Sequence, residues 1–345
     1  MLKTVKVEEA VGMPLAHDIT EIRPNEFKGA SFHKGHVVKM EDVQHLKRLG
    51  KHRLYILDLP KHQVHEDQAA LELAQALAGP GVTYTPQPRE GKIQFEAAHD
   101  GLFKVNAEPL IHFNMMPEVM CAAIHNNTPV KRGKALAGTR AIPLVIERKN
   151  LNSALQIARN NFPVFAVKPF RKLRAKLIIT GNEVYSGLIE DKFAPIVTEK
   201  IRSFGASLLD TVFLPDDATL IAEKIRRFAV ENIDLIITTG GMSVDPDDVT
   251  RLGVRMAGMD HIYYGAAVLP GTMFQLAYKE NLAVVSIPAG ALYHPVTTFD
   301  LILPRLLAGE KPNNEDLARF AVGGFCHNCS DCNFPACSFG KSVCF

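Results

Sequence analysis

The most regular pattern of apolar and polar positions covers residues 176 to about 310. Apolar runs of strand length alternate there with stretches whose apolar residues recur every three or four positions, as on one face of a helix. The runs 177–179, 207–213, 235–237 and 282–287 predict strands, and the stretches 193–204, 220–228 and 291–307 predict helices. Because the strands are apolar almost throughout, the pattern predicts a parallel sheet covered by helices on both faces, a three-layer α/β domain.

The first half of the chain is less regular. Short helices near residues 8–16 and 40–49 and a strand at 54–57 predict a small α+β segment, and an alanine-rich helix follows at 67–78. From 91 to 150, short extended pieces separated by turn residues predict a β-rich domain. The predicted division is therefore 1–65 (α+β), 66–150 (β-rich), 151–175 (linker), 176–310 (α/β domain) and 311–345 (cysteine-rich tail). Residues 60–150 carry no motif that indicates a function.

Composition places the chain among ordinary globular proteins. It has 345 residues, of which 47% are hydrophobic and 22% charged, with a formal net charge of +2. This balance gives no reason to expect a nucleic-acid or membrane partner. The N-terminus lacks the apolar core of a signal peptide, and no apolar run approaches membrane-spanning length, so we expect a cytoplasmic protein of two or three domains.

Four polar loops follow the predicted strands of the α/β region. They run from Thr180 to Gly187, from Leu214 to Asp217, from Thr238 to Asp248 and from Pro288 to Gly290, and they are rich in hydroxyls, glycines and carboxylates. The carboxyl ends of parallel strands meet at one edge of a sheet, which is where ligands bind in such folds. The sequence therefore predicts a ligand site built from all four loops.

The loop after the strand at 235–237 shows most clearly how such a loop could bind an anionic ligand. Two glycines at 240–241 would let a ligand approach the backbone, Asp245 has the character of a helix N-cap, and Pro246 suits a first helical position. Such an arrangement binds anions. The nearby carboxylates would repel a phosphate unless a divalent cation bridged them. The alternative interpretation is an ordinary strand-to-helix turn.

Taken together, these loops resemble a known family. Thr180-Gly181-Asn182-Glu183 resembles a TGDE element, Ser186 to Lys192 an SG…DK element, and Leu214-Pro215-Asp216 a Pro-Asp element. Thr238-Thr239-Gly240-Gly241 with Asp248-Val249-Thr250 is similar to a TTGG…DVT signature, and the segments at 270–271 and 287–290 fall where the family has PGKP and LPGNP. Residues 175–308 thus resemble the molybdopterin-binding domain of molybdenum cofactor biosynthesis, found in molybdopterin adenylyltransferases and molybdotransferases.

The resemblance implies a substrate, a metal and partners. Molybdopterin or adenylated molybdopterin would bind through its pterin and terminal phosphate, and Asp216 and Asp248 would be catalytic or would hold Mg²⁺. The implied cofactor-binding residues are Thr180, Gly181, Glu183, Ser186, Gly187, Thr238, Thr239, Gly240, Gly241, Ser243, Pro270, Gly271, Pro288 and Gly290. Molybdate and a client molybdoenzyme are further implied partners, and relatives are oligomers, which implies a homo-oligomer.

Some elements of the family are altered in this sequence. Because of these departures, three functions stay open. The DNSAMDGYA element of the molybdotransferases is absent, residues 20–30 reading TEIRPNEFKGA, and Thr272 stands where PGKP has its lysine. The first interpretation is a molybdotransferase-like enzyme. The second is a non-catalytic carrier or sensor that delivers the cofactor to a molybdoenzyme. The third is a nucleotide pyrophosphatase of the competence-damage protein type, whose TGGLGPTxDDxT element is close to residues 240–250.

Five of the six cysteines crowd the last twenty residues. Cys326, Cys329, Cys332 and Cys337 have the spacing C-x2-C-x2-C-x4-C, which is close to a ferredoxin run but has a longer last gap. Four thiolates would equally suit tetrahedral zinc, and Cys344 and His327 are spare ligands. We expect an iron–sulfur cluster or zinc here; the alternative is a redox-labile tail without metal.

Overall fold

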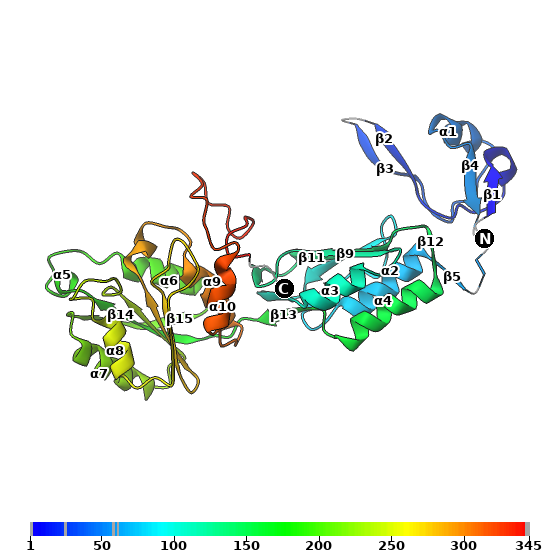
Figure 1. Ribbon diagram of the computed structural model, residues 1–345. Coiled ribbons are helices and arrows are strands. Elements are labelled where there is room, and N and C mark those ends of the chain that lie inside the picture. The colour runs from blue at the N-terminus through cyan, green and yellow to red at the C-terminus, as the bar shows by residue number, and fades with distance from the viewer. Residues whose placement is uncertain (1–2, 24–25, 57–58, 61, 342–345) are drawn as a thin grey trace. The chain divides into compact units, whose positions relative to one another are not determined.

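The computed structural model describes residues 3–23, 26–56, 59–60 and 62–341 (Figure 1). The chain forms two compact units. The first contains residues 1–98, 105–124 and 132–166, and the second contains 99–104, 125–131 and 167–345. The finer division into five segments stays a prediction. No helix among the described residues is long and apolar enough to cross a membrane.

The N-terminal part of the first unit is a small α+β assembly. Strand β1 (Lys3–Lys6) pairs antiparallel with β4 (Arg53–Ile56), and β2 (Ile19–Arg23) with β3 (Phe27–Phe32). Helix α1 (Asp42–Arg48) buries Val43 and Leu46 in the core that these strands share. The helix predicted at residues 8–16 is only a short 3₁₀ turn, η1 (Val7–Ala10).

The rest of the first unit combines helices with a sheet. Its four strands lie in the order β6 (Val82–Tyr84), β7 (Lys92–Ala97), β11 (Ala135–Ala141) and β9 (Val119–Ala123), and β5 (Gln63–His65) pairs with β12 (Val145–Glu147). The helices are α2 (Glu66–Leu77), α3 (Ala107–Asn114) and α4 (Arg148–Asn160). The prediction of short extended pieces missed α3, whose buried residues are Pro109 and Phe113.

The second unit is built on a six-stranded sheet. The strand order is β15 (Ser207–Leu214), β14 (Arg174–Thr180), β16 (Leu235–Thr239), β19 (Leu282–Ile287), β18 (Gln275–Lys279) and β17 (His261–Tyr264). The first four strands are parallel, as predicted. Strands β18 and β17 are antiparallel and were not predicted, so the sheet is mixed rather than wholly parallel.

Helices cover both faces of this sheet. Alternate residues of β16 point to opposite sides: Leu235 and Ile237 pack with α6 (Phe193–Ser203) and α9 (Thr298–Leu307), whereas Ile236 packs with α7 (Ala218–Ala229) and α8 (Thr250–Met256). The three-layer α/β prediction is therefore confirmed.

Shorter elements complete the second unit. The helix predicted at 291–307 is shorter than expected, because Thr297 and Asp300 form a capping box that starts α9 at Thr298, and a 3₁₀ turn η2 (Ala289–Leu292) precedes it. Helices α5 (Asn182–Tyr185) and α10 (Asn314–Ala318) and the 3₁₀ turn η3 (Arg319–Ala321) follow β14 and α9. Strands β10 (Thr128–Val130), β8 (Gly101–Val105) and β13 (Phe165–Pro169) form a separate sheet.

Candidate functional site

The register of the six-stranded sheet brings the four polar loops to one edge. Thr180 lies opposite Leu214, Ile179 opposite Thr239, and Thr239 opposite Ile287. The loops that begin at Thr180, Leu214, Thr239 and Ile287 therefore leave the sheet side by side. We call residues 180–187, 214–217, 239–250 and 288–290 the strand-end loops.

The segment containing Pro270 and Gly271 reaches the same edge by another route. Because β18 runs antiparallel to β19, with Gln275 opposite Ser286, the residues just before β18 lie beside the end of β19. The carbonyl of Gly271 accepts a 2.8 Å hydrogen bond from Thr298 Oγ1, which fixes this segment to the start of α9. All the predicted cofactor-binding residues thus lie in or next to elements that meet at this edge.

A close junction joins the loops after β14 and β16. The Thr180 hydroxyl donates to the carbonyl of Thr239 at 3.0 Å and lies 2.9 Å from the Thr250 hydroxyl. Gly240 has a φ of +84°, and a Cβ at this position would clash with the carbonyl oxygen of Thr180. At Gly241, with a φ of +55°, an added Cβ would clash with Thr250 Oγ1. Both glycines are therefore required by the backbone conformation and by the close approach of β14 to Gly240 and of α8 to Gly241.

The two threonines at the end of β16 have unsatisfied hydroxyls. Thr238 and Thr239 are fully buried, and within the described part of the chain neither Oγ1 atom has a hydrogen-bond partner. A buried hydroxyl without a partner costs about 1–3 kcal/mol, so such groups often mark a site that a ligand or water completes.

Asp216 and Asp217 have different tasks although they are neighbours. Asp216 Oδ2 accepts the Asn182 N–H at 2.9 Å, and the Asp216 N–H donates to Asn182 Oδ1 at 3.1 Å, so a reciprocal pair joins the loops after β14 and β15. Asp217 instead caps α7, because its Oδ1 accepts the N–H groups of Thr219 and Leu220. Only the Asp216 side chain faces the neighbouring loop.

Three carboxylates influence the pKa of Asp216 at this edge. Partial burial raises the pKa of Asp216, and the carboxylates of Glu183, Asp248 and Asp247 raise it further, against the opposing effect of the Asn182 N–H. None of the four forms an ion pair with another described residue. Nor do the described residues include three His, Cys, Asp or Glu side chains placed together so as to hold a metal ion.

The acidic loop after Gly241 differs from its prediction. Helix α8 begins at Thr250, and the residue at its N-cap is Val249, so Asp245 does not cap a helix and Pro246 is not its first residue. The Asp245 N–H donates to Asp248 Oδ2 at 3.1 Å, and the Asp248 N–H donates to the carbonyl of Asp245 at 3.0 Å. These residues close a tight turn instead, because an Asp side chain readily satisfies nearby backbone groups outside a helix.

The remaining predicted residues lie in the loops at this edge of the sheet, where several of them also determine the local backbone conformation. Gly181 (φ +140°) precedes α5, which contains Glu183, and Ser186 Oγ donates to the carbonyl of Asn182 at 2.6 Å. Gly187 has a φ of +74°. Ser243 is exposed, and Pro288 and Gly290 lie at the 3₁₀ turn η2.

Three residues outside the predicted set also belong to the edge. Asn182 holds Asp216, Thr250 completes the glycine junction, and the Tyr264 hydroxyl lies 3.4 Å from the carbonyl of Met242. Asn182 and Thr250 stand inside the motifs quoted above, so position within a motif was the available signal. Tyr264 belongs to β17, a strand that the apolar pattern did not predict.

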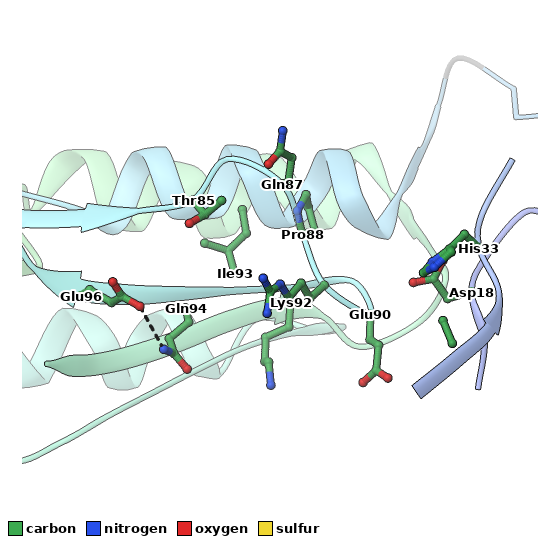
Figure 2. Close-up of a pocket in the computed structure, with 12 residues that line it drawn as sticks. Asp18, His33, Thr85, Gln87, Pro88, Glu90, Lys92, Ile93, Gln94 and Glu96 are labelled. Carbon is green, nitrogen blue, oxygen red and sulfur yellow. Dashed lines mark hydrogen bonds and ion pairs between the residues drawn. The ribbon is translucent and has the colours of Figure 1, made fainter. Parts of the chain in front are cut away.

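A cavity of about 740 Å³ in the first unit is unrelated to these loops. Figure 2 shows Asp18 and His33 on one side of it and residues 85–96 on the other. Its lining combines acidic, basic and amide side chains such as Glu90, Lys92 and Gln94 without a motif.

Comparisons with known proteins identify parts of both units. Residues 176–308 match the family model described as a probable molybdopterin binding domain, which confirms the resemblance over that region. Residues 4–58 match a domain of unknown function, DUF8806. No curated protein matches the chain.

Solved structures similar to this chain cover about two fifths of it. A molybdopterin biosynthesis enzyme MoaB from Thermus thermophilus is 19% identical, over 40% of this chain and 98% of its own, with a TM-score of 0.35. The molybdopterin biosynthesis Mog protein of Mycobacterium ulcerans is 24% identical (39% and 94%, TM-score 0.34). CinA, of unknown function, from Thermoplasma acidophilum is 16% identical (39% and 95%, TM-score 0.33). Likenesses this low carry no argument about activity.

Proposed function

For a chain whose residues 176–308 form a domain of the probable molybdopterin-binding family, we propose that the strand-end loops bind molybdopterin or adenylated molybdopterin. The protein would act in molybdenum cofactor biosynthesis as a molybdotransferase-like enzyme. The observation that carries the proposal is the sheet register, which places the ends of β14, β15, β16 and β19 at one edge.

The glycine junction suits the terminal phosphate of the ligand. Gly240 and Gly241 are partly exposed and follow the end of β16 with positive φ angles, a backbone conformation in which successive N–H groups can turn toward an anion. Thr239 Oγ1 needs a hydrogen-bond partner and lies directly before them. We assign the phosphate to this junction because it combines such a turn with a hydroxyl that has no protein partner among the described residues.

The neighbouring carboxylates suit Mg²⁺. Magnesium in proteins is commonly held by one or two carboxylates together with substrate phosphates and water, rather than by a cage of protein ligands. Asp216 and Asp248 would supply the carboxylates, with the phosphate and water completing the shell. Bound there, the metal would neutralise phosphate charge. The raised pKa of Asp216, caused first by burial and then by Glu183, Asp248 and Asp247, is consistent with an acidic group that lacks a counter-charge.

The chemistry supported by this arrangement is cleavage of the phosphoanhydride of adenylated molybdopterin. Water would attack the adenylyl phosphorus, the bond from that phosphorus to the bridging oxygen would break, and AMP and molybdopterin would be released, with the proton of the water passing to solvent. The residues of the chain would contribute positioning: Asn182 fixes Asp216, and the turn from Asp245 to Asp248 fixes the second carboxylate.

One observation favours the carrier alternative. Thr272 stands where the molybdotransferase element has a lysine, and its hydroxyl donates to the carbonyl of Val268 at 2.7 Å within its own turn. It offers no positive charge to molybdate or phosphate. A protein that binds the ligand at this edge without turnover would fit this substitution.

The test is a titration of the purified chain, under anaerobic conditions, with molybdopterin and adenylated molybdopterin in the presence and absence of Mg²⁺. Calorimetry measures binding, and AMP release measures turnover. We expect Asp216→Asn and Asp248→Asn to lower AMP release by roughly 100-fold. Asp217→Asn is the matched control, because it removes the same charge one position away while an asparagine still caps α7.

Each outcome separates the candidate functions. Binding with no AMP release from the unaltered chain supports the carrier and rejects the enzyme. Cleavage of ADP-ribose without pterin binding supports the nucleotide pyrophosphatase. A chain that binds neither form of molybdopterin, or an Asp217→Asn loss as large as that of Asp216→Asn, contradicts the proposed site.

A further inference from the structure

The cysteine-rich tail is a closed loop rather than a free end. The N–H of Gly340 donates to the carbonyl of Gly323 at 2.8 Å, which joins the two ends of a loop that contains four cysteines. At its start, Leu269 N–H donates to Gly324 at 2.7 Å, and Cys326 N–H donates to Leu269 at 2.8 Å. At its end, Phe339 is 2% exposed and packs in the core beside α9. The loop is therefore fixed to the α/β domain at both ends.

All four of these cysteines line one cavity. It has a volume of about 260 Å³, and Cys326, Cys329, Cys332 and Cys337 share its wall with His294 and His327. Cys326 and Cys337 also pack against the domain core, whereas Cys329 and Cys332 are exposed. Hydrophobic packing does not explain why four thiols from one short loop face the same space.

The first Cys-x2-Cys turn has a conformation suited to a thiolate. Asn328 adopts a φ of +51°, and its N–H donates to Cys326 Sγ at 3.4 Å. Backbone N–H groups directed at a sulfur stabilise its anionic form and orient it as a ligand.

We propose that Cys326, Cys329, Cys332 and Cys337 bind a [4Fe–4S] cluster in this cavity. Cys326, Cys329 and Cys332 have the Cys-x2-Cys-x2-Cys spacing of a ferredoxin run, in which each thiolate binds one iron atom of the cluster. Among the described residues no three His, Cys, Asp or Glu side chains are already placed to hold a metal ion, so the four thiols would close around the cluster as it binds.

Assembly of the cluster involves no redox step by the protein. Each thiol loses its proton to solvent, and the resulting thiolate forms one bond to an iron atom; two ferric ions, two ferrous ions and four sulfide ions come from outside the chain, so no oxidation state changes. Cys344 lies outside the described residues and is not needed for the four ligands. His294 and His327 line the same wall and remain near the cluster.

The cluster would lie beside one of the strand-end loops. Residues 293–296 form part of the cavity wall, and they directly follow the 3₁₀ turn after β19. The His294 N–H donates to the carbonyl of Gly290 at 3.2 Å, so the wall is hydrogen-bonded to the predicted cofactor-binding loop. This placement holds whether or not the loops bind molybdopterin.

The test uses the full chain, produced anaerobically and reconstituted with equal amounts of ferric and ferrous iron and with sulfide. We expect about four iron and about four sulfide per chain, a broad visible absorption, and an electron paramagnetic resonance signal after reduction with dithionite. Stoichiometric zinc that ferrous iron and sulfide do not displace would overturn the proposal. So would a reconstituted chain that contains neither iron nor sulfide.

Substitutions of the cysteines test which of them bind the cluster. Cys329→Ser and Cys332→Ser should each bind roughly tenfold less iron. Both side chains are exposed, so circular dichroism should show an unchanged fold. Ser330→Ala, between them, is the matched control and should keep its iron. If Cys329→Ser and Cys332→Ser retain full iron, the tail does not ligate the cluster. Molybdopterin titration of the same variants is independent of this result, so the two proposals fail separately.

Discussion

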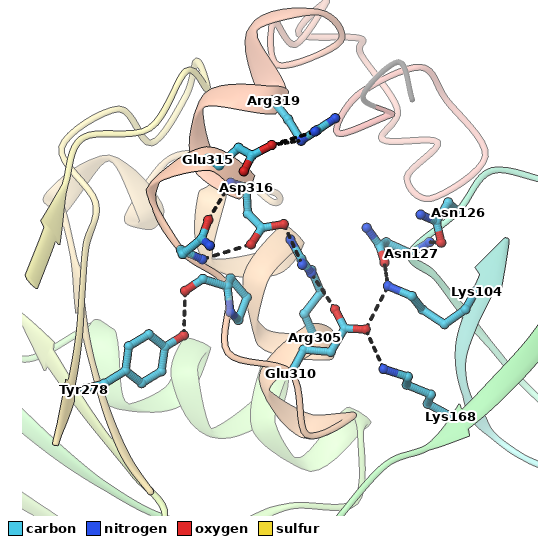
Figure 3. A network of polar contacts seen from close by, with 12 residues as sticks. Lys104, Asn126, Asn127, Lys168, Tyr278, Arg305, Glu310, Glu315, Asp316 and Arg319 are labelled. Carbon is cyan, nitrogen blue, oxygen red and sulfur yellow. Dashed lines mark hydrogen bonds and ion pairs between the residues drawn. The ribbon is translucent and has the colours of Figure 1, made fainter. Parts of the chain in front are cut away.

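Two groups of carboxylates in the second unit show opposite electrostatic arrangements. Around Glu310, which follows α9, every acidic group faces a cation (Figure 3). At the strand-end loops, the carboxylates of Glu183, Asp248 and Asp247 lie near enough to raise the pKa of Asp216, and Asp216 forms no ion pair among the described residues. The same residue type therefore has counter-charges in one place and like charges in the other.

The Glu310 network is dense and largely buried. Glu310 Oε1 lies 2.7 Å from Lys104 Nζ and 3.0 Å from Lys168 Nζ, and Oε2 lies 2.8 Å from Arg305 Nε. Arg305 also contacts Asp316 at 2.8 Å. Burial alone would raise the pKa of Glu310, but hydrogen bonds from Lys104 and Arg305 outweigh it and lower the pKa to about 2.

The difference supports the proposed ligand site at the strand-end loops. A paired, hydrogen-bonded carboxylate already has its counter-charge and contributes to stability. A set of neighbouring carboxylates without cations costs free energy, which a bound metal or cationic group would recover. The comparison thus separates structural acids from candidate functional acids without reference to any relative.

The largest loss in the free energy of unfolding is expected from Gly240→Ala. The added Cβ would clash with the Thr180 carbonyl oxygen while forcing a non-glycine residue to a φ of +84°, so we expect a loss of about 4 kcal/mol in the free energy of unfolding. Gly258→Ala is the control, since its φ is +78° but the space around it is open, and it should lose only about 1 kcal/mol. Urea denaturation measures both. Equal losses would mean that the glycine junction is not closely packed.

The next largest loss in the free energy of unfolding is expected from breaking the ion pairs of Glu310. Glu310→Gln leaves Arg305, which is 11% exposed, without its main counter-charge, so the free energy of unfolding should fall by about 3 kcal/mol. Glu315→Gln breaks an exposed pair with Arg319 and should change it by less than about 0.5 kcal/mol. Similar losses in the two variants, again by urea denaturation, would show that the Glu310 network stabilises no more than a surface pair.

The sequence predicted the architecture of the second unit where apolar runs were long. Strand β19 was predicted at its observed bounds, and residues 193–204 and 220–228 proved to be α6 and α7. Strand β17 was missed because only Ile262 among its four residues is aliphatic, and β18 was missed because its apolar run is only Leu276 to Tyr278, between Gln275 and Lys279. The two antiparallel strands therefore depend on the pairing of β18 with β19 and of β17 with β18, which sequence pattern does not show.

The candidate site was predicted at the level of loops rather than of individual roles. The motifs placed Asp216, Gly240 and Pro288 at one edge, and the register of β14, β16 and β19 brings them there. The turn at Asp245 was mistaken for a helix start because Asp-Pro has the same signature in both settings. The pairing of Asn182 with Asp216 spans two loops, so local sequence could not reveal it.

A smaller loss in the free energy of unfolding is expected when the pH is lowered. The pKa of Glu310 is lowered from 4.5 to about 2, so its contribution is fully present above the unfolded-state pKa and is lost as the pH falls from about 4.5 through about 2. We expect the free energy of unfolding to fall by about 2 kcal/mol over that range. Glu310→Gln should flatten this part of the profile measured by denaturation at each pH. An unchanged slope would show that other carboxylates cause the acid sensitivity.

The smallest change in the free energy of unfolding is expected from a substitution of Asp216, which has no ion pair among the described residues. Because burial and three neighbouring acids raise the pKa of Asp216, its charged form opposes folding at every pH above that pKa, and the penalty disappears as the pH falls below the unfolded-state value. Asp216→Asn keeps an acceptor for the Asn182 N–H and removes the charge, so at neutral pH it should raise the free energy of unfolding by about 0.5 kcal/mol. The gain should vanish in acid, and Mg²⁺ with the adenylated ligand should reverse it by stabilising only the unaltered chain. Thermal melts across pH measure the effect, and a destabilised Asp216→Asn at neutral pH would mean that Asp216 is already paired and that the two groups of carboxylates do not differ.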